Sequence, residues 1–101
     1  MNKRFKITRL DEQQNPTITL QQCKEYFATL PDFTYEDAFI SKNKEGVTMT
    51  IKGDFFMWQI QDVSFPFRFF DGEIYVAVSH PIIMKKVQEI ASDLQAEFIE
   101  G

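Results

Sequence analysis

Residues 37–79 read DAFISKNKEGVTMTIKGDFFMWQIQDVSFPFRFFDGEIYVAVS, and this stretch decides the fold. Apolar and polar residues alternate over several short runs, as in β-strands with one buried face. Turn-forming residues separate the runs: Asn43 to Gly46, Gly53-Asp54, Gln61 to Ser64, and Asp71-Gly72. The stretch therefore predicts an antiparallel meander of five strands.

The last two turns set the register of the C-terminal half of this meander. Asp71-Gly72 is a preferred pair for a two-residue type I′ turn, and it places Phe67 opposite Val76. A four-residue loop over Gln61 to Ser64 places Trp58 opposite Phe67. Both registers put the tryptophan and the phenylalanines of these strands on one face.

The first two turns extend the same pattern towards the N-terminus. Gly53-Asp54 predicts a type II′ turn, which places Met49 opposite Trp58. A loop over Asn43 to Gly46 then places Ile40 opposite Met49. Because a slip of one residue inverts every side chain of a strand, four agreeing turns predict one strongly apolar face.

The centre of that face is aromatic, and it consists of Phe56, Trp58, Phe65, Phe67 and Phe69. Pro66 lies within the same run and has no amide to donate. We therefore expect a bulge or frayed pairing there.

Two helices are predicted on either side of the meander. Thr19 and Gln22 have the spacing of a capping box before a helix over Leu20–Leu30, which Pro31 ends. His80-Pro81 opens a second helix over Pro81–Leu94, with proline at the first helical position. Both helices carry an apolar stripe, so we expect them to cover the aromatic face of the sheet.

Short strands are expected at the two ends of the chain. Lys3 to Arg9 alternates and predicts an edge strand, and Ala96 to Glu100 predicts a terminal strand whose acids suit pairing with it. The sequence thus predicts one α+β domain over residues 1–101. It is an antiparallel five-strand meander, with short terminal strands, covered on one face by two helices.

Composition limits the classes of function. The 101 residues carry a net charge of −4, and the basic residues Lys3, Arg4, Lys6 and Arg9 are concentrated in the first ten. The remainder is strongly acidic, which argues against nucleic-acid binding and against an anionic membrane surface. The single cysteine, the lack of a signal-like start and the lack of a long apolar run predict a soluble, cytoplasmic protein.

No pattern of catalytic or metal-binding residues is found. His80 is the only histidine, and its place before Pro81 is typical of a helix cap. Cys23 lies on the apolar stripe of its helix, as a small buried residue does. No glycine-rich phosphate loop, calcium loop or cysteine-histidine cluster occurs, so we expect no enzymatic activity, no cofactor and no metal.

The outward face of the predicted sheet is the candidate site. The registers place aromatic residues, a methionine and an arginine there, where water is expected: Phe39, Phe55, Met57, Arg68, Phe70 and Tyr75. Such residues are enriched in protein interfaces. The predicted function is therefore non-enzymatic contact through this face, with a protein partner or with a second copy. The alternative is binding of a small apolar ligand in a cavity between the curved sheet and the helices.

The sequence leaves several points open. It does not identify the partner or ligand, the biological process, the oligomeric state or the order of the edge strands. It also does not say whether Gly101 is the natural C-terminus.

Overall fold

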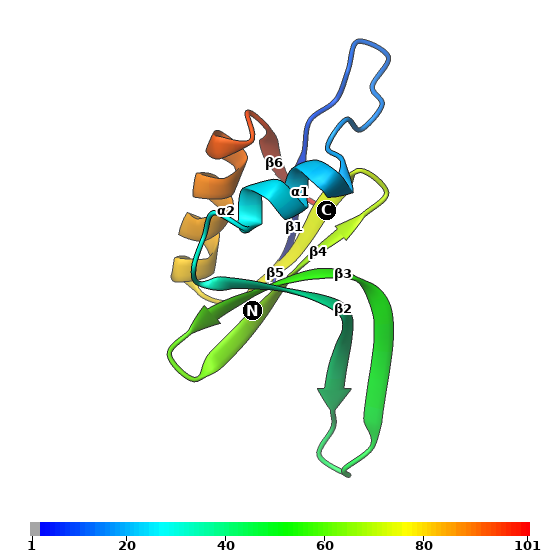
Figure 1. The fold of residues 1–101 in the computed structure, drawn as a ribbon, viewed down its shortest axis with the longest axis vertical. Coiled ribbons are helices and arrows are strands. Elements are labelled where there is room, and N and C mark those ends of the chain that lie inside the picture. The colour runs from blue at the N-terminus through cyan, green and yellow to red at the C-terminus, as the bar shows by residue number, and fades with distance from the viewer. Residues whose placement is uncertain (1–2) are drawn as a thin grey trace.

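The computed structural model describes residues 3–101, which form six strands and two helices. In chain order these are β1 (Lys3–Thr8), α1 (Leu20–Phe27), β2 (Phe33–Lys42), β3 (Thr48–Ile60), β4 (Val63–Phe70), β5 (Glu73–Val78), α2 (Pro81–Asp93) and β6 (Glu97–Glu100). The strands form one antiparallel sheet in the order β2-β3-β4-β5-β1-β6. Both helices lie over the same face of this sheet (Figure 1). The predicted fold class, an α+β domain with a meander and terminal strands covered on one face by two helices, is confirmed.

The meander has four strands because the predicted turn at Gly53-Asp54 does not form. β3 runs without interruption from Thr48 to Ile60. The pairing with β2 shifts between Glu36 and Ala38, where β3 holds two residues, Gly53 and Asp54, against the single Asp37. This is a β-bulge, which bends a strand and increases its twist. The prediction of a type II′ turn there is wrong.

The other predicted turns have mixed outcomes. Asp71 and Gly72 have φ angles of 51° and 79°, and Phe67 pairs with Val76, so the type I′ turn and its register are confirmed. Trp58 pairs with Phe65 across a turn of only two residues. This register differs from the prediction by two residues, which preserves the face of every side chain.

The pairing of β2 with β3 differs by one residue beyond the bulge. Ile40 lies opposite Thr50, and Met49 lies opposite Ser41, so the predicted pair Ile40–Met49 is wrong. Pro66 pairs with Met57 on β3, whereas the pairing of β4 with β5 begins only at Phe67. The expected fraying beside the proline is therefore confirmed.

The two terminal strands lie side by side. β6 pairs with β1, with Thr8 opposite Glu97, which confirms the predicted pairing of the chain's two ends. β1 also pairs with β5, so it is an inner strand, and the prediction of an edge strand at Lys3 to Arg9 is wrong. β6 and β2 are the edges of the sheet.

The core lies between the sheet and the helices, as expected. Its fully buried side chains come from β1, β3, β4, β5 and both helices: Ile7, Cys23, Phe56, Phe67, Ile74, Ile83, Val87 and Ile90. Phe27 of α1 stacks on Phe56 with ring centroids 4.5 Å apart. The central aromatic residues of the predicted face therefore hold the helices on the sheet.

The helices begin at the predicted caps and end earlier than predicted. The Thr19 hydroxyl accepts a hydrogen bond from the Gln22 amide at 3.1 Å, and His80 Nδ1 accepts one from the Ile82 amide at 3.2 Å. α1 ends at Phe27, and α2 ends at Asp93, shortly before Gln95, whose φ of 54° is left-handed. The Gln22 side chain does not complete the capping box, because its oxygen accepts from Arg9 instead.

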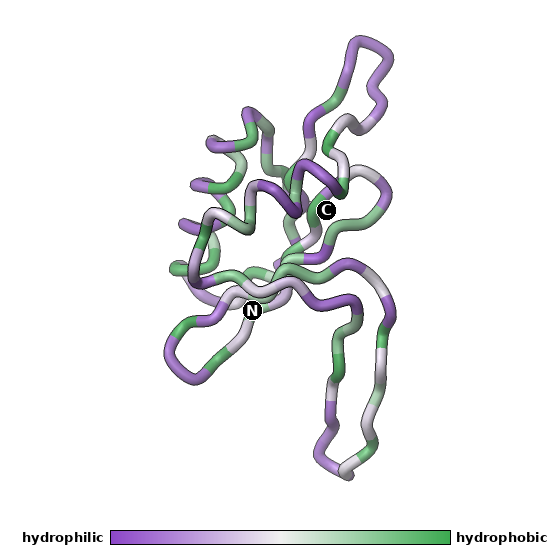
Figure 2. The backbone as a smooth tube through the Cα atoms, in the orientation of Figure 1, coloured by the Kyte–Doolittle hydropathy of each residue, from purple (hydrophilic) through white to green (hydrophobic). Residues whose placement is uncertain are grey.

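Beyond the bulge, β2 and β3 leave the body as a two-stranded hairpin, residues 38–52, which we call the arm. The arm points away from the helices (Figure 1), and the molecule measures 47 × 27 × 27 Å as a result. Hydrophobic stretches follow the arm where no other segment lies beside it (Figure 2). Within residues 38–52 the two strands of the arm pair only with each other.

Candidate functional site

Five of the six predicted surface residues form one chain of contacts. The Phe39 and Phe55 rings lie 5.6 Å apart, which connects the arm to the body. The Arg68 guanidinium lies 5.4 Å from the centre of the Phe55 ring and 5.2 Å from that of Phe70. Phe70 in turn lies 6.5 Å from Tyr75. The contacts run from the arm across β3 and β4 to β5.

A groove of about 500 Å³ opens beside this chain of contacts, on the face of the sheet away from the helices. We call it the arginine groove. Its lining consists of Arg4, Phe55, Pro66, Arg68, Phe70, Tyr75, Val76, Ala77 and Gly101. It combines aromatic walls with two cationic side chains, which suits a ligand with an apolar part and a negative charge.

Two of the predicted residues are less exposed than expected. Phe55 is 4% exposed and Met57 is 9% exposed, so neither presents a large apolar area to water. Met57 lies opposite Pro66 rather than Arg68, because the turn between β3 and β4 is shorter than predicted. Phe70, at 55% exposed, is the most accessible aromatic residue of the groove.

Arg68 is held between aromatic rings and the backbone. A methyl group added at Gly53 would lie 3.3 Å from the Arg68 Nε and 3.2 Å from the Phe55 ring, so the missing side chain leaves room for the guanidinium. The Nε atom of Arg68 is buried and has no hydrogen-bond partner among residues 3–101. A buried donor without an acceptor destabilises the folded state.

Glu73, which lies opposite Phe70 on the sheet, is already engaged. Its carboxylate accepts a hydrogen bond from the Tyr75 hydroxyl at 3.0 Å and lies 3.5 Å from the Lys6 ammonium. Burial acts to raise the pKa of Glu73, but the Thr8 and Tyr75 hydroxyls and Lys6 outweigh it, so this pKa lies below its ordinary value of 4.5. Burial and the Glu73 carboxylate raise the pKa of Tyr75.

Apart from Phe39, the arm was not predicted as a site. The predicted registers placed Val47 and Met49 on the buried face, opposite Ile60 and Trp58 respectively. In the structure Ile40, Val47 and Met49 are 67%, 57% and 60% exposed. The bulge bends this part of the hairpin away from the helices, so its apolar residues lose the cover that the prediction assumed. No single residue of the arm predicts this exposure from the sequence, because the exposure follows from the bulge.

The edges of the arm are open as well. β4 pairs with β3 only from Asp54 to Ile60, so β3 has no neighbour on that side from Thr48 to Lys52. β2 is an edge strand over its whole length. Both strands of the arm therefore present backbone amides and carbonyls to which another strand could pair.

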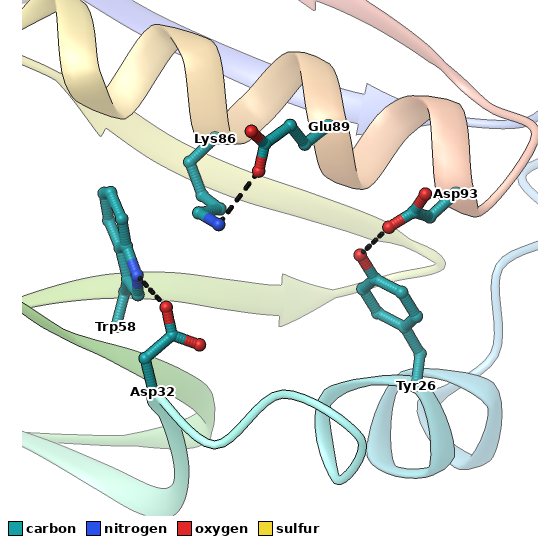
Figure 3. A network of polar contacts seen from close by, with 6 residues as sticks. All are labelled: Tyr26, Asp32, Trp58, Lys86, Glu89 and Asp93. Atoms are coloured by element: carbon teal, nitrogen blue, oxygen red, sulfur yellow. Dashed lines mark hydrogen bonds and ion pairs between the residues drawn. The ribbon is translucent and has the colours of Figure 1, made fainter.

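The helix-covered face carries a separate set of polar contacts (Figure 3). Trp58 Nε1 donates to the Asp32 carboxylate at 2.9 Å, the Tyr26 hydroxyl donates to Asp93 at 2.6 Å, and Lys86 pairs with Glu89 at 2.9 Å. Each polar group here has a partner within the chain. These contacts connect α1 to α2 and β3 to the segment between α1 and β2, and we assign them to the stability of the fold.

The two residues weighed for nucleophilic chemistry occupy different places. His80 caps α2 and lines a shallow pocket whose lining does not include Cys23. Cys23 is fully buried, and burial raises the pKa of its thiol to about 12. A thiol with that pKa is a poor nucleophile at neutral pH.

The fold forms a further cavity, but residues 3–101 hold no cluster of metal ligands. Within residues 3–101 there is no group of three or more histidine, cysteine or acidic side chains arranged to hold a metal ion, and no helix has the length and apolar character to span a bilayer. A pocket of about 350 Å³ opens between α1 and the strands β2 and β3. Its lining is Lys24, Phe27, Ala28, Phe33, Tyr35 and Phe56.

Comparison with known proteins found no match to a family model, to a curated protein or to a solved structure. The site must therefore be interpreted from its own geometry.

Proposed function

We propose that this protein is a non-enzymatic interaction domain that contacts another protein, or a second copy of itself, through the arm and the arginine groove. The chain of contacts from Phe39 to Tyr75 supports this, because it makes the two parts one continuous surface. The proposal includes a reducing, cytoplasmic location, which the single buried cysteine fits.

The observation that carries the proposal is the exposed arm. A two-stranded hairpin is marginally stable in water by itself. This one extends beyond the body with Ile40, Val47 and Met49 more than half exposed and with both strand edges open. Proteins often shield such edges with lysines, prolines or covering segments; this arm has three lysines, but no other strand among residues 3–101 covers its edges. A partner that covers the arm would remove apolar surface from water and supply the missing backbone hydrogen bonds.

A charge substitution on the arm tests the proposal. Met49→Glu places a carboxylate in the proposed contact, and Val63→Glu is the matched control at the β3–β4 turn, where Val63 is 50% exposed. Self-association is measured by sedimentation velocity over a range of concentrations. Heterologous partners are measured by quantitative affinity capture from the native host.

We expect Met49→Glu to weaken the contact by roughly thirtyfold, the effect of losing one strong interface residue, while Val63→Glu leaves it intact. If neither substitution changes self-association or the captured proteins, the arm is not the contact surface. Circular dichroism spectra of both variants establish that the fold is retained.

The second candidate, binding of a small apolar ligand between sheet and helices, has a narrower basis. The pocket between α1 and β2 is lined by Phe27, Phe33 and Phe56, which suits an apolar molecule. A ligand bound there would raise the unfolding temperature by linkage. A screen of fatty acids and aromatic metabolites that leaves this temperature unchanged would remove the candidate.

A further inference from the structure

The arginine groove carries two cationic side chains that have no hydrogen-bonding or anionic partner within residues 3–101. Over residues 3–101, neither Arg4 nor Arg68 forms a side-chain hydrogen bond or an ion pair, although both line the same groove. Arg9 provides a contrast, because its guanidinium donates to Thr17, Gln22 and the Leu94 carbonyl. The fold can thus supply acceptors to an arginine, as it does for Arg9, but it supplies none to the two arginines of the groove.

The fold keeps Arg68 in position without neutralising it. The rings of Phe55 and Phe70 hold the guanidinium, and Gly53 leaves space for it against the backbone. The carboxylate of Glu73 is engaged by Lys6 and Tyr75 instead. A guanidinium that is ordered by stacking and lacks an anion loses little entropy when a carboxylate binds it.

We propose that the arginine groove binds a single carboxylate next to an aromatic or large apolar side chain, on an extended segment of a protein partner. This rests on the proposed function and specifies its chemistry. Arg68 supplies charge-assisted hydrogen bonds to the carboxylate, and Arg4 adds a second positive charge. Phe70 and Tyr75 contact the neighbouring apolar side chain, and the open edge of β3 pairs with the backbone of the segment.

Charge decides between this occupant and a second copy of the chain. The arm has three lysines, Lys42, Lys44 and Lys52, and one acid, Glu45, which gives it a net charge of +2. An arm from another molecule would therefore bring positive charge to two unpaired arginines. Like charges placed together oppose binding, so the groove does not suit the arm of a second copy.

Charge also argues against nucleic acid. Glu36 lies opposite Phe55, which itself lies opposite Arg68. Glu73 lies opposite Phe70, and Glu97 lies opposite Thr8 farther along the sheet. None of these acids lines the groove, but together they interrupt any basic track across this face, and the whole chain has a net charge of −4. A phosphate backbone needs a continuous basic track, whereas a single carboxylate needs only the two arginines.

Two capped tripeptides test the proposal. Acetyl-Phe-Asp-Phe-amide and acetyl-Phe-Asn-Phe-amide differ only in the charge of the central side chain. Each is titrated into the ¹⁵N-labelled protein, and dissociation constants are taken from the amide and arginine side-chain shifts. A hexathymidylate is titrated in parallel as the nucleic-acid probe.

We expect the aspartate peptide to bind at least roughly tenfold more tightly than the asparagine peptide, with shifts centred on Arg68, Phe70 and Tyr75. Arg4→Gln and Arg68→Gln should each remove most of this preference. Lys44→Gln, at the tip of the arm, removes the same charge and should preserve it. Arg4 is exposed, so its variant keeps the test valid even if Arg68→Gln disturbs the groove.

Equal binding of the two peptides, or an equal effect of Lys44→Gln, would overturn the proposal. Tighter binding of the hexathymidylate at the same residues would overturn it in favour of nucleic acid. None of these results depends on the Met49→Glu experiment, so the arm can fail as a contact surface while the carboxylate site stands, and the reverse.

Discussion

Replacing Arg68 with methionine separates a binding role from a structural one. The substitution removes two contacts between the guanidinium and aromatic rings, at 5.4 and 5.2 Å. Each is worth about 0.5–1 kcal/mol at a partly exposed position. It also removes the buried Nε without a partner, whose desolvation costs about 1–3 kcal/mol. Methionine retains the apolar stem of the side chain. The two effects oppose each other, so we expect the free energy of unfolding to change by less than about 1 kcal/mol.

Arg9→Met is the matched control. Arg9 donates to Thr17 Oγ1 at 3.0 Å, to the Leu94 carbonyl at 2.7 Å and to Gln22 Oε1 at 2.8 Å. It thereby connects the loop after β1 with both helices. Methionine leaves these acceptors without their donor, and the expected loss is about 3 kcal/mol.

Urea denaturation followed by the fluorescence of Trp58, the only tryptophan, measures both variants. In a domain of this size 1 kcal/mol corresponds to about 4–8 °C in the unfolding temperature, so thermal scans should separate the two variants clearly. Arg68→Met should also lose the preference for the aspartate peptide while remaining folded. If Arg68→Met destabilises the protein as much as Arg9→Met does, Arg68 is a structural residue and the reasoning on the groove fails.

Three further predictions concern titrating groups. Because the pKa of Glu73 is lowered, its interactions stabilise the fold above about pH 4.5, and this stabilisation is lost as the pH falls further. Glu73→Gln should therefore cost about 1–2 kcal/mol of unfolding free energy at pH 7. Urea titrations at pH 7 and well below pH 4.5 should show that the difference between the variant and the unmodified protein shrinks in acid. The pKa values of Tyr26, Tyr35 and Tyr75 are all raised, that of Tyr35 to about 12 through its hydrogen bond to an acid, so tyrosinate absorbance should rise well above pH 10, and a transition near pH 10 in the folded protein would contradict this. The buried Cys23 thiol should react with a disulfide reagent only at the rate of unfolding, and rapid labelling of the folded protein at pH 8 would show that it is accessible.

The alternation of side chains was a sound guide to which residues are buried in the body of the sheet. Phe56, Trp58 and Phe67 lie on the helix-covered face, as predicted, although the register of β3 with β4 was two residues off. An error of two residues preserves the face because the strand period is two. Asp71-Gly72 was identified correctly because a left-handed pair of residues is a local demand that the sequence states directly.

Gly53-Asp54 was misread because glycine followed by aspartate is common in turns, whereas Gly53 lies in a bulge and does not adopt the positive φ that a type II′ turn needs. The decision was made by distant partners: Phe33 to Glu36 pair with β3 on one side and β4 pairs with it on the other. Those pairs keep β3 extended through the glycine. The β-forming residues after Pro31 could have revealed this, because they start β2 at Phe33. A strand of that length pairs with β3 past Gly53 and leaves no place for a turn at Gly53-Asp54.

The position of β1 in the sheet could not be predicted from its own residues either, because it too depends on distant partners. Its alternation identifies a strand but not its neighbours, and its place between β5 and β6 depends on how the two ends of the chain meet. The sequence predicted which residues make up the candidate site, but not which of them are exposed. Phe39, Phe55, Arg68, Phe70 and Tyr75 do contact one another, but the exposed surface is Phe70 and the arm.

The bulge therefore determines both parts of the proposed contact surface. It turns the arm away from the helices, which exposes Val47 and Met49, and it brings Gly53 against Phe55 and Arg68. The direction of the arm and the position of the guanidinium are consequently coupled through one short backbone segment. A partner that pairs with the open edge of the arm contacts the same β3 segment that confines Arg68. A single ligand that engages both the arm and the groove should therefore bind more tightly than either contact alone would allow.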